Sequence, residues 1–246
     1  RKDLEQVKEQ RETQRKQRRK NAVPVVSIVG YTNAGKSTIM NQILMKMGQE
    51  DSKQVFEKNM LFATLETSVR NIELPDNKSF LLTDTVGFVS KLPHHLVKAF
   101  RSTLEEARDS DLLLHVVDVS NEEHSFMMDV TNETLKAVGV EDIPTIYVYN
   151  KSDLANVKYP LVSGDNIWLS AKDGAGLDEL IELIKLYIFS DYITCKMLIP
   201  YDKGNVVSYL NEVATVMTTS YEEEGTLLEI EIKQSDYNKY EQYVIK

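Results

Sequence analysis

The 246-residue sequence predicts an α/β fold, in which a mostly parallel sheet carries helices on both faces and a small α+β C-terminal domain follows. Two observations predict it. From Val23 onward, short β-rich runs alternate with helical stretches, which is the order of a doubly wound sheet. Beyond residue 190 strand-like runs dominate, in a segment expected to dock on the larger domain. The composition, 42% hydrophobic and 27% charged, excludes wholesale disorder.

The first segment, residues 1–20, is a basic arm of net charge +5, whereas the net charge of the whole chain is -9. Helix formers dominate the arm, but only Leu4 and Val7 are apolar, so a helix there has no apolar stripe to bury. Two interpretations stay open: the solvated end of a missing N-terminal domain, or an arm that contacts RNA phosphates. The acidic body argues against a generic nucleic-acid binder.

The larger domain is expected over residues 21–190. Its β-rich runs are Val25–Val29, Val69–Leu74, Ser79–Thr83, Leu112–Val117, Thr145–Tyr149 and Ile167–Leu169, and its helical stretches are Lys36–Met47, Leu96–Arg108, Glu122–Val138 and Leu177–Phe189. The strand pair around Pro75–Asn77 is close enough in sequence for a hairpin, so one edge of the sheet should be antiparallel. Between the first helix and the second strand, Gly48–Phe62 forms no convincing element, and a loop of that length is usually functional or mobile.

The C-terminal domain is expected over residues 191–246. Its strand-like runs are Thr194–Ile199, Thr215–Thr219 and Leu227–Ile232, and its helix-like runs are Val206–Val213 and Ser235–Tyr243. The single cysteine, Cys195, cannot form an internal disulfide and is interpreted as a small core residue, which favours a reducing compartment. With no apolar stretch near 18 residues and no signal-peptide region, a cytoplasmic protein without stable membrane insertion is expected.

The strongest motif is Gly30–Ser37, GYTNAGKS, which fits G-x-x-x-x-G-K-[ST] between an expected strand and an expected helix. Glycines let the backbone wrap around phosphates so that successive N–H groups point inward, and the helix N-terminus adds a positive dipole end. Lys36 is expected to reach the β- and γ-phosphates, and the Ser37 hydroxyl to ligate Mg²⁺.

A second motif, Asp84–Gly87, follows the apolar run Phe80–Leu82. A carboxylate at the carboxyl end of such a strand faces the crevice where ligands bind. Asp84 is expected to hold Mg²⁺ through water, and the Gly87 N–H to reach the γ-phosphate and sense its loss.

Two further groups of residues predict a guanine pocket. In Asn150–Asp153, an aspartate carboxylate can accept hydrogen bonds from guanine N1–H and the 2-amino group, a donor pair that adenine lacks. Lys151 can lie over the base, and Asn150 can tether the surrounding loops. Ser170–Lys172 ends the next strand and is expected to complete the pocket.

These four motifs in this order indicate a P-loop GTPase related to translation factors. The stretches GYTNAGKST, LFATLETSVR and LLTDTVGFVSKLPHHLVKAFRSTLEEA resemble the HflX family of ribosome-associated GTPases, over about residues 11–190. The resemblance implies that Thr64 is the switch I threonine, a Mg²⁺ ligand that contacts the γ-phosphate; spacing alone leaves Thr64 and Thr67 open. It also implies that the large ribosomal subunit and its rRNA are the partner, and that stalled ribosomes are split.

The expected catalytic residues are Lys36, Thr64 and Gly87, and the expected metal ligands are Ser37, Thr64 and Asp84. The residues expected to bind GTP or GDP are Gly30, Tyr31, Thr32, Asn33, Ala34, Gly35, Lys36, Ser37, Thr38, Phe62, Ala63, Thr64, Leu65, Glu66, Asp84, Thr85, Val86, Gly87, Asn150, Lys151, Ser152, Asp153, Ser170, Ala171 and Lys172.

Two positions bear on the rate of hydrolysis. Phe88 follows Gly87 where Ras-like enzymes carry a glutamine, and a phenyl ring cannot orient water, so slow intrinsic hydrolysis and help from a partner are expected. Asn33 either shapes the phosphate loop or holds K⁺ beside the phosphates. Among the four histidines, His115 is expected in the core, and His94 and His95 near switch II.

Three functions stay in view. The first is a GTP-hydrolysing switch on the ribosome, acting as a monomer. The second is a nucleotide-gated module that binds RNA or ribosomal particles with negligible turnover. The third is a GTPase of ribosome assembly or tRNA modification, against which the excess of acidic residues in 191–246 argues, because an appended RNA-binding domain should be basic.

Overall fold

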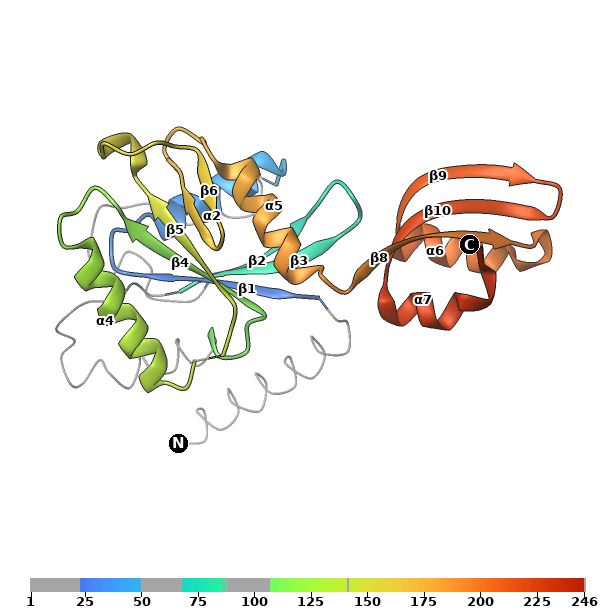
Figure 1. Ribbon diagram of the computed structural model, residues 1–246, viewed down its shortest axis with the longest axis horizontal. Coiled ribbons are helices and arrows are strands. Elements are labelled where there is room, and N and C mark those ends of the chain that lie inside the picture. The colour runs from blue at the N-terminus through green and yellow to red at the C-terminus, as the bar shows by residue number, and fades with distance from the viewer. Residues whose placement is uncertain (1–22, 50–67, 86, 88–106, 141, 246) are drawn as a thin grey trace.

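The computed structural model describes residues 23–49, 68–85, 87, 107–140 and 142–245. They form a seven-stranded sheet of order β2-β3-β1-β4-β5-β7-β6 and a four-stranded sheet of order β11-β8-β10-β9. Figure 1 shows the four-stranded sheet at one end of the molecule, beyond the end of helix α5. The connection between them is short, because α5 ends at Ile188 and β8 begins at Tyr192.

The large sheet agrees closely with the sequence prediction. Its strands are β1 (Val25–Gly30), β2 (Ser68–Glu73), β3 (Ser79–Asp84), β4 (Leu112–Asp118), β5 (Thr145–Asn150), β6 (Leu161–Ser163) and β7 (Asn166–Trp168). All six predicted strands are confirmed to within one residue at each end. The exposed three-residue strand β6, which pairs antiparallel with β7, was not predicted.

Strand β1 lies in the interior of this sheet, parallel to β3 on one side and to β4 on the other. Its apolar residues are buried on both faces, so the strand reads as a continuous hydrophobic run rather than an alternating one. The expected hairpin is confirmed, because β2 pairs antiparallel with β3 from Ser68 opposite Asp84 to Glu73 opposite Ser79. In its turn Asn77 has a φ of 60°, a conformation that asparagine tolerates.

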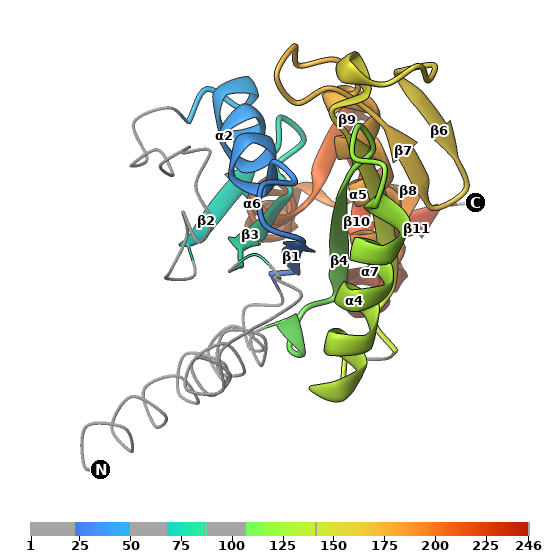
Figure 2. The ribbon, with the colours of Figure 1, turned by 90° about the vertical axis from the view of Figure 1, so that its left-hand side faces the viewer.

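Helices cover both faces of the large sheet, as Figure 2 shows. Helices α2 (Lys36–Lys46) and α5 (Leu177–Ile188) bury their apolar sides in the main core. Helix α4 (His124–Ala137) lies on the opposite face, where Leu135 packs against Val29 and Leu113. The spacing of buried residues in α5, at Leu177, Leu180, Ile181 and Ile184, is that of an amphipathic helix.

The C-terminal sheet, defined here as β8 to β11 with its helices, has its own core. Its elements are β8 (Tyr192–Ile199), α6 (Gly204–Val213), β9 (Thr215–Glu222), β10 (Gly225–Lys233), α7 (Gln234–Tyr240) and β11 (Val244–Ile245). The alternating residues Leu228, Ile230 and Ile232 of β10 are fully buried under these helices. The helix predicted over Ser235–Tyr243 is shorter than expected, because the chain tightens into a 3-10 turn over Glu241–Tyr243.

Several expectations lie outside the described residues. These are the arm of residues 1–20, nearly all of the Gly48–Phe62 loop, His94 and His95, and nearly all of the helix expected over Leu96–Arg108. Among the helices that the structure does describe, none has the length and apolar character needed to cross a membrane.

Candidate functional site

The carboxyl ends of the parallel strands bring the predicted site residues to one edge of the large sheet. Strands β1, β3, β4 and β5 end in Gly30, Asp84, Asp118 and Asn150, and all four run in the same direction. Strand β1 lies between β3 and β4, so the strand order of the sheet reverses beside it. The crevice at such a reversal is where open α/β sheets bind their ligands.

The loop Gly30–Gly35, called the phosphate loop here, leads from β1 into helix α2. Gly35 has a φ of 94°, and a Cβ there would lie 2.2 Å from the Asn150 amide nitrogen, so only glycine fits. The first turn of α2 contains no acidic residue. No carboxylate of this turn neutralises the positive end of the helix dipole, which can therefore attract an anion.

The Lys36 ammonium is buried beneath this loop, with 7% of the residue exposed. Its Nζ donates to the carbonyl oxygens of Gly30 at 3.2 Å and Tyr31 at 3.0 Å. Burial lowers the pKa of Lys36 to about 8, and the nearby Asp84 carboxylate opposes that shift. Because mainly neutral carbonyl groups surround this buried ammonium, an anionic ligand would stabilise its charged form.

Ser37 and Asp84 lie in contact, since the Ser37 hydroxyl donates to Asp84 Oδ2 at 2.6 Å. Asp84 is fully buried, and next to it the Thr85 hydroxyl donates to the Ile28 carbonyl oxygen at 2.7 Å, which ties the end of β3 to β1. A hydroxyl and a carboxylate are hard oxygen ligands, so this pair fits Mg²⁺ by the chemistry of its donors.

Gly87 lies directly against the phosphate loop. A Cβ at this position would lie 2.8 Å from Lys36 Nζ and 2.8 Å from the Thr32 Cα. The absence of a side chain is therefore what lets this residue approach Lys36.

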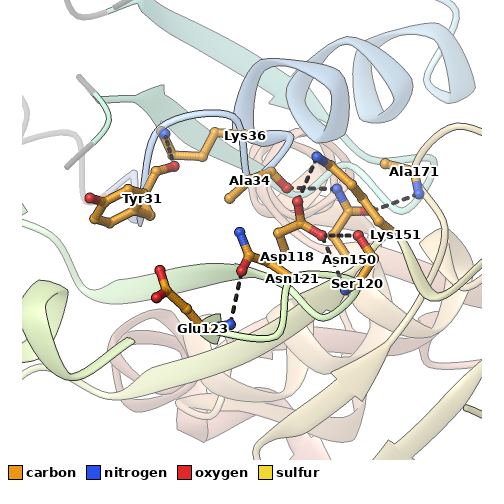
Figure 3. A network of polar contacts seen from close by, with 10 residues as sticks. All are labelled: Tyr31, Ala34, Lys36, Asp118, Ser120, Asn121, Glu123, Asn150, Lys151 and Ala171. Atoms are coloured by element: carbon orange, nitrogen blue, oxygen red, sulfur yellow. Dashed lines mark hydrogen bonds and ion pairs between the residues drawn. The ribbon is translucent and has the colours of Figure 1, made fainter. Parts of the chain in front are cut away.

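Asn150 joins the phosphate loop to the predicted guanine pocket, as Figure 3 shows. Its Nδ2 donates to the Ala34 carbonyl oxygen at 2.9 Å, and its Oδ1 accepts from the Ala171 N–H at 3.0 Å. Both hydrogen bonds are buried. The expected tether is thus present as one amide that holds two loops.

Asp153 faces Ser170, whose hydroxyl donates to Asp153 Oδ1 at 2.9 Å. Lys151 has a φ of 62° and pairs through Nζ with Asp118 Oδ2 at 2.7 Å. Sequence reasoning missed Asp118. Like Asp84, Asp118 is a carboxylate at the end of a buried strand next to β1, and this position could have identified it. Unlike Asp84, it belongs to no recognised motif.

The remaining predicted positions divide into described and undescribed ones. Thr38 lies in the first turn of α2, Ser152 is buried and donates to the Tyr149 carbonyl oxygen, and Lys172 is exposed. Seven further positions lie outside the described residues, namely Phe62, Ala63, Thr64, Leu65, Glu66, Val86 and Phe88. The structure therefore brings together the predicted residues of the phosphate loop, of Asp84–Gly87 and of the guanine pocket. The predicted switch I residues are not among those that it describes.

Burial explains two other candidate residues, His115 and Cys195. His115 is 1% exposed, as expected of a core residue, and burial lowers its pKa to about 4, against a hydrogen bond from Asn132. Partial burial raises the pKa of the Cys195 thiol, which fits a packing role rather than a nucleophile. In the described part of the chain, no three His, Cys, Asp or Glu residues cluster as metal ligands.

Comparison with known proteins decides the family. Residues 25–151 match the family model described as 50S ribosome-binding GTPase. The HflX GTPase of Lacrimispora saccharolytica is 43% identical over 226 residues, 91% of this chain, and the HflX GTPase of Escherichia coli is 36% identical over 91% of it. The chain belongs to the HflX family of GTPases. It spans about half the length of these relatives, 52% in both cases.

Solved structures place this HflX-family chain in the P-loop GTPase fold. A GTP-binding protein from Sulfolobus solfataricus, solved in complex with GDP, aligns with a TM-score of 0.52 at 28% identity, over 68% of this chain and 53% of that one. Era from Aquifex aeolicus aligns with a TM-score of 0.53 at 24% identity, which supports the fold alone. The predicted fold class is confirmed.

Proposed function

We propose that this chain binds guanine nucleotide with Mg²⁺, hydrolyses GTP to GDP and phosphate, and works as a switch on the large ribosomal subunit. The observation that carries the proposal is the single network at the sheet edge. In it, Asn150 links the phosphate loop to the loop of Ala171, while Lys36 and the Ser37–Asp84 pair lie beside the same phosphate loop. Membership in the HflX family supports the activity and the partner.

The phosphates would lie over the loop that precedes α2. Backbone N–H groups would bind the phosphate oxygens, and the Lys36 ammonium would exchange its two carbonyl partners for the β- and γ-phosphates. Ser37 and, through water, Asp84 would hold Mg²⁺ with Thr64, and the ion would neutralise phosphate charge. Gly87 would present its N–H to the γ-phosphate from its place beside Lys36.

Selectivity for guanine would come from Asp153. Its carboxylate would accept from N1–H and the 2-amino group, and the Ser170 hydroxyl already orients one of its oxygens. Lys151, held by Asp118, would lie against the base. A carboxylate facing adenine would be left unpaired, which makes the discrimination steep.

Hydrolysis by the chain alone would be slow, because Phe88 offers no group that can orient water. Asn33 is exposed at the rim of the phosphate loop, where it could hold K⁺ as an added positive charge. Equal turnover in potassium and sodium buffers would rule out the K⁺ role.

The proposal extends to the whole chain. Residues 21–190 would form the GTPase domain of a cytoplasmic monomer, residues 191–246 an appended C-terminal domain, and residues 1–20 an arm that helps to contact rRNA. GTP would order the two switch segments, and the ordered surface would grip the large subunit and drive the splitting of stalled ribosomes.

Steady-state GTP turnover, measured with and without purified large ribosomal subunits, tests this function. A rise on the order of tenfold or more is expected, since partner-supplied catalytic groups commonly give larger effects. Lys36→Ala, which removes the phosphate-binding ammonium, is the control that should show no rise.

Other outcomes would separate the alternatives. Tight guanine-nucleotide binding with negligible turnover, even on the ribosome, would favour a nucleotide-gated binding module. Stimulation only by immature subunits would favour a GTPase of ribosome assembly. Absence of guanine-nucleotide binding would overturn the proposal altogether.

A further inference from the structure

The β2–β3 hairpin reaches from the nucleotide site to the C-terminal sheet. At one end of β3, Asp84 contacts Ser37. The other end of β3, at Ser79, is about 17 Å away at the rise of an extended strand, and the hairpin turns just beyond it at Asp76 and Asn77. Six consecutive antiparallel residue pairs join β2 and β3 over this length. This unbroken ladder gives a continuous hydrogen-bonded path from Asp84 to the turn.

The turn is fastened to the C-terminal sheet by an ion pair between a buried lysine and a partly exposed glutamate. Lys78 has only 5% of its side chain exposed, and its Nζ lies 2.7 Å from Glu231 Oε2 in β10. The same ammonium lies over the rings of Phe189 and Tyr192, at 5.2 and 4.8 Å from their centroids. These two rings flank the short connection between α5 and β8, so Lys78 contacts both that connection and the sheet beyond it.

Asp76 makes two more contacts at the same place. Its carboxylate pairs with Lys185 of α5 at 3.1 Å, and the pKa of Lys185 is raised because its bonds with Asp76 and Glu182 outweigh the opposing effect of burial. Its backbone carbonyl accepts a hydrogen bond from the Thr215 hydroxyl at the start of β9. One turn therefore binds α5, β9 and β10.

We propose that these five residues, Asp76, Lys78, Lys185, Thr215 and Glu231, form a joint through which the bound nucleotide sets the orientation of the C-terminal sheet. The inference rests on the proposed GTP switch, and it identifies the C-terminal sheet as the part of the molecule that the switch moves. Exchange of GDP for GTP changes the contacts of Asp84 and Gly87, the hairpin shifts, and the Lys78–Glu231 pair carries the C-terminal sheet with it. Because such coupling is reciprocal, the joint also sets the relative affinity for the two nucleotides.

The test measures the distance between the two sheets in each nucleotide state. Spin labels at the exposed positions Phe126 and Tyr221, introduced as cysteines in a Cys195→Ser background, report this distance by pulsed electron resonance. Glu231→Gln removes the charge of the carboxylate that contacts Lys78 at 2.7 Å and leaves Asp76, whose Oδ2 lies 4.0 Å from the same ammonium within the hairpin turn. Glu229→Gln is the matched control, since Glu229 lies two residues away on the same face of β10 and pairs with Lys196 inside the C-terminal sheet.

With the joint intact, the distance distribution should differ between GDP and a non-hydrolysable GTP analogue, and it should do so equally in Glu229→Gln. In Glu231→Gln the two distributions should coincide, and the ratio of the two nucleotide affinities should change by about fivefold or more. Thermal unfolding of each variant confirms that it is folded.

Two results would overturn the joint: one distribution for both nucleotide states in the unmodified joint, or a full nucleotide-dependent change in Glu231→Gln. Fluorescent analogues of both nucleotides, titrated into the same samples, separate this failure from that of the proposed function. Binding without a change in distance contradicts the joint, whereas no binding contradicts the function itself.

Discussion

At the scale of single residues, the site depends on polar groups held where water cannot reach them. Lys36 is the extreme case, since its ammonium is buried with two carbonyl oxygens as partners and its pKa is lowered to about 8. Such a group is costly in the empty site and favourable once a phosphate arrives. We therefore expect Lys36 to couple phosphate binding to its own protonation.

Nucleotide affinity is accordingly expected to depend on pH. Lys36 in the empty site loses its proton as the pH rises through about 8, while a bound phosphate keeps the proton on. Binding at pH 9 must then take up a proton, so the affinity for GDP should fall roughly tenfold between pH 7 and pH 9. Isothermal titration calorimetry at several pH values measures this affinity for GDP. Lys36→Arg, whose guanidinium stays charged, should show a flatter profile, and equal profiles would contradict the assignment.

At the scale of elements, two loops from different strands are held in register by one side chain. Asn150, at the end of β5, bonds to Ala34 in the phosphate loop and to Ala171 after β7. The predicted phosphate and guanine pockets are thus linked, because one side chain holds both loops. Pre-organisation of this kind raises affinity without adding a contact to the ligand.

Asn150→Ala should consequently weaken binding of GDP although Asn150 need not touch it. The substitution leaves a buried carbonyl oxygen and a buried N–H unsatisfied, at about 1–3 kcal/mol each. We expect a lower melting temperature together with a loss of affinity on the order of tenfold or more. Asn121→Ala is the control, since Asn121 lies in the same region but its side chain accepts from the nearby Glu123 N–H and does not join the two loops. Equal losses in both variants would refute the tether.

At the scale of the whole molecule, two cores are connected by a short chain segment and a polar joint. The main core lies between the large sheet and helices α2 and α5, and the C-terminal sheet has its own apolar cluster. Contacts between the two parts include the ion pairs and the hydrogen bond of the hairpin turn. Two cores joined in this way are expected to open separately.

Native-state hydrogen exchange can resolve that separation. Leu228→Ala removes a fully buried side chain from the C-terminal core and should destabilise it by about 2–5 kcal/mol. Exchange should become faster in β8 and β10 but stay unchanged in β1 and β4. Leu114→Ala, in the main core, should give the reverse pattern. Faster exchange in both parts of either variant would show a single cooperative unit instead.

The sequence predicted most of the large sheet and the phosphate loop, because both depend on local signals. A buried strand reads as an apolar run, and GYTNAGKS specifies a turn whose glycines can be recognised individually. Strand β6 escaped prediction because its three residues are exposed and carry no alternation. Asp118 and the joint at Lys78 escaped it because their partners, Lys151 and Glu231, come from distant parts of the chain. Pairing at long range leaves no mark on local periodicity.

The place where Thr215 meets the turn has a mechanical consequence. Strand β9 starts at this residue and runs to Glu222, so the acidic tip at Glu223 and Glu224 lies about 25 Å from the joint. A rotation of β9 about the hairpin turn therefore displaces the far end of the strand more than its start. A tilt of about 5° there, too small to disturb any single hydrogen bond, would sweep the tip through about 2 Å at that arm length. A small movement at the nucleotide site would thus become a larger one at this acidic corner, far from the phosphate.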